Sequence, residues 1–223
     1  MKIFLGYLIT YVWIFFVLGL TIVMKKKGVA EEATRKIVHV SVGFTWIAMA
    51  LCFGPTFHLI IPPVTFVVLN YVSYKKNIFS GMEREGEANT LGTVYYAVSL
   101  AVMSVITVIR PDFIYFYGIG TFCMALGDGL APIIGKTKKC NFPIIKGKRS
   151  FLGSLSVFVI SLIVCIVFKA IFALPIGPVA IIVTALAAAV LEIVGLKGID
   201  NLTLPIGTSV IAWLFFFISA VAA

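Results

Sequence analysis

Residues 151–173 read FLGSLSVFVISLIVCIVFKAIFA, and Lys169 is the only charged side chain in this run. A helix that crosses a bilayer needs about 20 consecutive, mainly apolar residues, so the run predicts a transmembrane helix. The whole chain has the same character: 61% of its 223 residues are hydrophobic and 12% are charged, with a mean hydropathy of +1.11. Soluble domains are roughly half apolar and a quarter charged. The composition therefore predicts an integral membrane protein.

Eight apolar runs predict an all-α, polytopic membrane helix bundle of about eight helices (roughly seven to nine), forming a single domain over residues 1–223. The runs lie at 3–24, 37–53, 57–74, 92–109, 113–134, 151–173, 176–194 and 203–222. They are continuous rather than alternating, which argues against a β-barrel. Four scattered cysteines exclude a disulfide scaffold. The hydrophobicity excludes a nucleic-acid-binding domain, despite a net charge of +9.

The distribution of charge predicts the orientation. Of the 18 basic residues, all but Lys2, Arg110 and Lys169 lie in connections that follow odd-numbered runs. The positive-inside rule places these connections in the cytoplasm and both termini outside. All nine acidic residues except Asp112 lie on or beside the same face. The rule does not account for acids, and phosphate and metal chemistry needs both signs of charge. We therefore expect the active site on the cytoplasmic face of the cell membrane.

Asp128 is the first candidate for chemistry. It lies between Gly127 and Gly129, near the end of the fifth run. A carboxylate in an apolar segment is costly and is a functional hypothesis by default. Flanking glycines let a backbone or ligand approach closely, and a carboxylate is a usual protein ligand of nucleotide-bound Mg²⁺. The structural alternative is a helix-end aspartate paired with a nearby lysine.

A basic segment leads into the sixth run. It contains Lys146, Lys148 and Arg149, and Ser150 opens the helix. A helix N-terminus favours anions, Arg149 can bind phosphate through two hydrogen bonds, and Ser150 can cap the helix or bind a phosphate oxygen. The alternative is a loop that contacts anionic lipid headgroups. A P-loop is excluded, because no G-x-x-x-x-G-K-[ST] sequence occurs.

Three further groups of residues are candidates for chemistry. Arg35 and His39 are four residues apart and so share a helix face. For Arg35 the alternatives are phosphate binding and anchoring of the helix. For His39 they are a structural and a catalytic role. Glu87 is either a solvated loop residue or a functional carboxylate. Glu192 opposes the dipole at the end of the seventh run, which indicates a nearby cation or metal.

Asp200 and its neighbour Asn201 precede the last run. Short polar side chains of this kind favour helix N-caps. The two residues therefore either cap the last helix or take part in function.

Taken together and in order, these motifs resemble one family. They are Arg35-Lys36-x-x-His39, Gly86-Glu87 with Gly92-Thr93-Val94-Tyr95-Tyr96, Gly127-Asp128-x-x-Ala131, Lys148-Arg149-Ser150-x-x-Gly153-Ser154, and Glu192 with Asp200-Asn201-x-Thr203-x-Pro205. The family is the membrane CTP-dependent polyprenol kinases, the group of phytol kinase, dolichol kinase and CTP-dependent diacylglycerol kinase, and the phytol-kinase-like branch is the most similar. Leu152 replaces the glutamate of the family's Lys-Ser-x-Glu-Gly-Ser motif, so a role for that glutamate does not carry over.

The resemblance implies transfer of the γ-phosphate of CTP to the hydroxyl of a membrane lipid alcohol: phytol, geranylgeraniol, a polyprenol or diacylglycerol. Such transfer depends mainly on positioning and on neutralising charge. The resemblance also implies that Asp128 binds Mg²⁺, with Asp200 or Glu192 as a further ligand. The residues expected at the nucleotide are Arg35, Lys36, Gly127, Gly129, Lys146, Lys148, Arg149, Ser150 and Asn201. The base that accepts the alcohol proton is open between Glu87, His39 and Asp200.

Two other functions use some of the same features. A phosphatidate cytidylyltransferase also needs CTP, Mg²⁺ and a lipid, but it bonds a different phosphorus to the lipid. A small transporter would need repeated halves or polar residues at mid-membrane on several helices, and the sequence has no internal repeat. An oligomer is compatible with the small residues that suit close helix packing.

Overall fold

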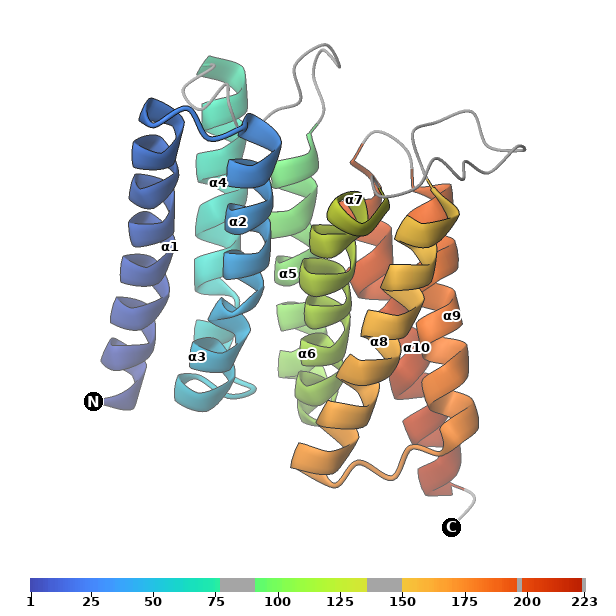
Figure 1. Ribbon diagram of the computed structural model, residues 1–223. Coiled ribbons are helices and arrows are strands. Elements are labelled where there is room, and N and C mark those ends of the chain that lie inside the picture. The colour runs from blue at the N-terminus through green and yellow to red at the C-terminus, as the bar shows by residue number, and fades with distance from the viewer. Residues whose placement is uncertain (77–90, 136–149, 196–197, 222–223) are drawn as a thin grey trace. The chain divides into compact units, whose positions relative to one another are not determined.

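The computed structural model describes residues 1–76, 91–135, 150–195 and 198–221. These residues are almost entirely helical and include no strand, which confirms the all-α prediction. The helices, shown in Figure 1, are α1 Lys2–Lys26, α2 Glu31–Gly43, α3 Thr45–Cys52, α4 Ile61–Lys76, α5 Gly92–Ile109, α6 Ile114–Phe122, α7 Gly129–Gly135, α8 Phe151–Phe172, α9 Pro178–Val194 and α10 Asp200–Val221.

Every predicted apolar run is helical. Three of the runs consist of more than one helical element. α2 and α3 together cover Glu31–Cys52, and a 3₁₀ turn precedes α4 in Phe57–Lys76. The fifth run contains a short 3₁₀ turn, α6, a π-helical segment and α7. Within the described residues, seven helical segments are long and apolar enough to cross a membrane, and α9 is apolar but shorter. The chain is therefore a polytopic membrane helix bundle, as the composition predicts.

Several helix boundaries follow from local sequence. Pro178 is in the first turn of α9, where its missing N–H is not needed. α8 ends where Ala173 adopts a left-handed conformation, with φ of 50°. Gly54, with φ of +57°, takes the left-handed turn after α3 that a glycine adopts without strain. These boundaries set the lengths of the spans.

The chain divides into two compact units. The first comprises Met1–Ile114 with Leu196–Leu202, and the second comprises Tyr115–Gly195 with Thr203–Ala223. The expectation of a single domain over 1–223 stays a prediction.

In the first unit, α1 packs against α2 and α3, and α4 packs against α5. α1 and α4 run in one direction and α2 and α5 in the other (Figure 1). The basic C-terminal ends of α1 and α4 therefore lie at the same end as the first turns of α2 and α5. At the other end, the Tyr7 hydroxyl lies 2.8 Å from His58 Nδ1. The charged end is the one that the sequence predicts to be cytoplasmic.

In the second unit, α8 packs against α9, α7 and the π-helical segment. Helices α6 and α10 meet at Gly120: a Cβ added there would overlap Ser209 Oγ and the Pro205 carbonyl oxygen. Only glycine lets the two backbones approach so closely. α8 begins, and α9 ends, at the end of this unit that holds its candidate site residues.

Candidate active site

Asp128 lies at the end of an unusual stretch of helix. Residues Cys123–Asp128 form a π-helical segment between α6 and α7. Such turns are rare in proteins, and those that occur are often at functional sites. Most of the segment is buried, whereas Asp128 is half-buried. A Cβ added to Gly127 would come within 3.3 Å of Val157 Cγ1, so this glycine brings the segment close to α8. The Asp128 carboxylate thus sits at the end of a tightly packed segment.

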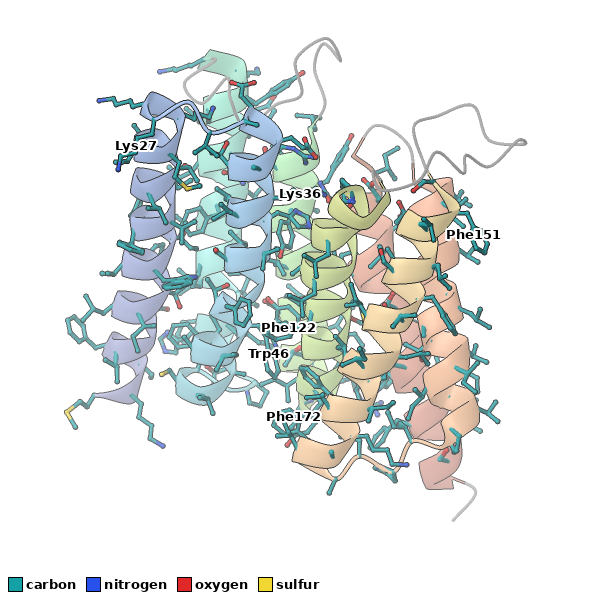
Figure 2. All side chains as sticks on the ribbon, viewed as in Figure 1. Lys27, Lys36, Trp46, Phe122, Phe151 and Phe172 are labelled. Atoms are coloured by element: carbon teal, nitrogen blue, oxygen red, sulfur yellow. The ribbon has the colours of Figure 1, made fainter. Side chains whose placement is uncertain are left out.

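The start of α8 has the features of an anion-binding helix terminus. Its first residue is Phe151 (Figure 2). Ser150 is the N-cap, because its Oγ accepts a hydrogen bond of 3.1 Å from the Gly153 N–H. A Cβ added to Gly153 would lie 3.3 Å from the Ala131 carbonyl oxygen of α7. The helix that follows Asp128 therefore contacts the first turn of α8, whose N–H groups and dipole favour a negative charge.

Glu192 of α9 is held by the same turn of α8. Ser154 Oγ donates a hydrogen bond of 2.9 Å to Glu192 Oε2, and the two residues are only 5% and 6% exposed. The Ser154 N–H also donates to the Ser150 carbonyl oxygen at 3.1 Å. The carboxylate at the C-terminus of α9 is therefore stabilised by a hydroxyl at the positive end of α8. The sequence predicted a nearby cation or metal and did not predict this hydroxyl.

In the first unit, α2 contributes two buried side chains that can carry a positive charge. Lys36, labelled in Figure 2, is 5% exposed and His39 is 7% exposed; lysine is almost never buried unless paired. The His39 ring lies 4.8 Å from the Tyr96 ring, and the Tyr96 hydroxyl donates to the His39 carbonyl oxygen at 3.3 Å. Arg35 forms an ion pair with Glu32 at 2.7 Å, as expected of an arginine that anchors its helix.

Asp200 and Asn201 form the first turn of α10, three residues before the predicted start of the last run. Asp200 is 8% exposed, and its Oδ1 accepts a hydrogen bond of 3.1 Å from the Asn201 N–H. The Asn201 side-chain amide donates to the Gly92 carbonyl oxygen at 3.0 Å. Both residues thus make hydrogen bonds at the start of α10, and their role as N-caps stays a prediction.

The described residues hold no group of three or more His, Cys, Asp or Glu side chains that would bind a metal by themselves. Mg²⁺ does not need such a group, because it is usually held by one or two carboxylates together with substrate phosphates and water. Asp128 fits this pattern, because it is a half-buried carboxylate directly before α7, a helix that contacts the anion-binding start of α8. Glu87, Lys146, Lys148 and Arg149 lie outside the described residues.

Two known proteins resemble this chain over most of its length. It is 31% identical over 186 residues to phytol kinase from Synechocystis sp., an alignment that covers 82% of this chain and 78% of the relative. It is 27% identical over 214 residues to probable phytol kinase 1, chloroplastic, from Oryza sativa subsp. japonica, covering 86% of this chain and 67% of the relative. No protein-family model matches the chain, and no solved structure matches it.

Proposed function

The chain belongs to the phytol-kinase-like polyprenol kinase family, and from this premise we propose that it transfers the γ-phosphate of CTP to the hydroxyl of a membrane isoprenoid alcohol. Phytol, geranylgeraniol and a longer polyprenol are the candidate acceptors, with diacylglycerol as a further possibility. One observation supports the proposal most directly: α7, which follows Asp128, contacts the capped N-terminus of α8. A carboxylate and an anion-binding helix start are thereby on contacting elements of one compact unit.

The donor side needs a positively charged site for the triphosphate. The α8 N-terminus supplies N–H groups and a favourable dipole, and Ser150 holds the cap of this helix. Lys146, Lys148 and Arg149 add cationic donors. Asp128 would hold Mg²⁺, which neutralises charge on the phosphate oxygens when bound. Phosphoryl transfer depends mostly on positioning and on this neutralisation.

The acceptor side needs a group that takes the proton of the alcohol as the alcohol oxygen attacks the γ-phosphorus and CDP leaves. His39, Asp200 and Glu87 are the candidates, and the first two are buried in the first unit. Lys36 and Arg35 add positive charge beside His39. We propose that the lipid tail enters between helices from the bilayer and that the hydroxyl reaches the cytoplasmic interface, where CTP is available.

The test uses purified protein, Mg²⁺ and the lipids phytol, geranylgeraniol, polyprenol, diacylglycerol and phosphatidate. CTP is labelled at the γ- or the α-phosphate, and γ-labelled ATP is tested in parallel. The proposal expects γ-label from CTP in an isoprenoid alcohol. Label from the α-phosphate in phosphatidate would instead establish a cytidylyltransferase. No labelled lipid from either nucleotide would overturn the kinase proposal and favour a transporter.

A further inference from the structure

In the first unit, the turn that precedes α10 lies directly against the backbone of the first residue of α5. Gly198 has φ of +85°, and a Cβ added to it would lie 2.9 Å from Gly92 Cα and 3.3 Å from Gly92 N. L side chains rarely adopt this φ, and no real Cβ is found so close to another backbone. The pair of glycines therefore lets the turn before Asp200 lie against the start of α5.

Asn201 stabilises the contact between this turn and α5 through hydrogen bonds. Its Nδ2 donates to the Gly92 carbonyl oxygen at 3.0 Å, although the two residues are 109 positions apart. Its backbone N–H donates to the Gly198 carbonyl oxygen and to Asp200 Oδ1, each at 3.1 Å. One residue thus closes the turn, orients the Asp200 carboxylate and joins both to α5.

These contacts suggest a role for Asn201 different from the nucleotide ligand that the family motif implies. A side-chain amide has two N–H donors and one acceptor oxygen, and one donor of Asn201 is used by the α5 backbone. Its neighbour Asp200 is 8% exposed, so a small shift of the turn would move a buried carboxylate that has little room to readjust.

We infer that Asn201 is a positioning residue, which holds the Asp200 carboxylate in place for phosphate transfer by fixing the first turn of α10 to Gly92 of α5. This inference rests on the proposed function, because it requires that Asp200 takes part in the transfer. Asn201 acts through Asp200 and does not touch the nucleotide.

The chain supplies a matched control in the same unit. Thr93 is the residue after Gly92, and its carbonyl oxygen accepts a hydrogen bond of 3.0 Å from Nδ2 of Asn70 in α4. Asn70 and Asn201 therefore make the same kind of hydrogen bond, of the same length, to adjacent carbonyls in the first turn of α5. Neither chain neighbour of Asn70, Leu69 or Tyr71, is a candidate catalytic residue, whereas Asn201 directly follows Asp200. Asn70→Ala therefore measures the structural loss.

The experiment compares Asn201→Ala, Asn201→Gln and Asn70→Ala in the labelled-nucleotide assay, with the apparent unfolding temperature of each variant in detergent. Loss of a hydrogen bond of this kind corresponds to a fall of about tenfold in kcat for Asn201→Ala, with the KM for CTP unchanged. Asn201→Gln keeps the amide donor and restores part of the activity. Asn70→Ala keeps the wild-type kcat.

Two further variants test the route of the effect. In an Asp200→Asn background, Asn201→Ala should cause little further loss, because the residue it positions is already disabled. Gly198→Ala forces the turn away from Gly92 without altering the Asn201 amide, and it should lower kcat in the same way. Gly198→Ala also keeps the inference testable if Asn201→Ala fails to fold.

The outcomes separate the two proposals. An active wild-type protein in which Asn201→Ala raises the KM for CTP and leaves kcat unchanged makes Asn201 a nucleotide ligand and overturns the inference alone. Equal losses of kcat in Asn201→Ala and Asn70→Ala also overturn it, because the role is then structural. A wild-type protein that transfers no phosphate overturns the proposed function, and the inference falls with it.

Discussion

Replacing Ser154 by alanine removes the hydroxyl that donates to Glu192 and leaves the carboxylate in place. The hydrogen bond is 2.9 Å long, and both residues are more than nine-tenths buried. A hydrogen bond to a charged group contributes about 1.5–3 kcal/mol, and bulk water does not reach this site to replace it. Glu192 is a candidate to help Asp128 hold Mg²⁺, so a loss of this size at Glu192 would slow phosphate transfer. Since about 1.4 kcal/mol is a factor of ten, we expect Ser154→Ala to lower phosphate transfer about ten- to a hundredfold.

Three companion variants identify the cause of that loss. Glu192→Gln keeps an oxygen that accepts from Ser154 but removes the charge, so a larger loss than in Ser154→Ala would show that the charge itself is needed. Ser154→Thr retains the hydroxyl and should recover activity. Ser156 is a control on the same helix: it is buried, and its hydroxyl donates to the Gly153 carbonyl oxygen at 2.6 Å, not to Glu192.

The assay follows transfer of labelled phosphate to the lipid alcohol in detergent, together with the apparent unfolding temperature of each variant. Ser154→Ala should lose transfer, whereas Ser156→Ala should keep it. The reasoning would be refuted by a Ser154→Ala protein that matches the wild type in both activity and unfolding temperature. It would fail equally if Ser156→Ala lost as much activity as Ser154→Ala.

Three other substitutions test single features. Asp128→Asn should abolish phosphate transfer while the protein stays folded in the membrane. Near-normal activity of this variant would contradict the assignment of Asp128 as the Mg²⁺ ligand. Gly120→Ala should destabilise the protein by more than the about 1–3 kcal/mol of ordinary overpacking, because the added Cβ meets the Pro205 backbone. The loss is measured as a lower apparent unfolding temperature. Gly19→Ala, with nothing within 4 Å of its Cβ, is the control and should change little. Ser150→Ala should destabilise the start of α8 by about 1 kcal/mol; Ser150→Thr should not, and equal unfolding temperatures would contradict the capping role.

The spans were predictable because hydropathy alone defines them, but their internal breaks were not. The second run was expected from residue 37, whereas α2 begins at Glu31. Its first turns are charged and so do not register as apolar, although they are helical. The π-helical segment Cys123–Asp128 has the same apolar composition as an α-helix, so composition does not reveal it.

The candidate site shows the same division between local and distant information. The Ser150 cap was predictable, because its partner Gly153 is three residues away. The bond from Ser154 to Glu192 joins residues 38 positions apart, and it depends on how α8 and α9 pack. Contacts of this kind follow from tertiary structure and have no signature in spacing along the chain.

The π-helical segment before Asp128 also changes how this region should be compared between relatives. A π turn takes about one residue more than an α turn, and one residue corresponds to roughly 100° of rotation in a helix of 3.6 residues per turn. The segment therefore changes the direction of the side chains that follow it by roughly 100°, relative to a continuous α-helix of the same sequence. A helical wheel drawn continuously from Ile114 assigns Asp128 to the wrong face, whereas a relative that lacks one residue between 123 and 127 and keeps a regular α-helix there would direct its aspartate to the same face. A one-residue gap at this place in an alignment therefore does not by itself separate relatives that share this site from those that do not.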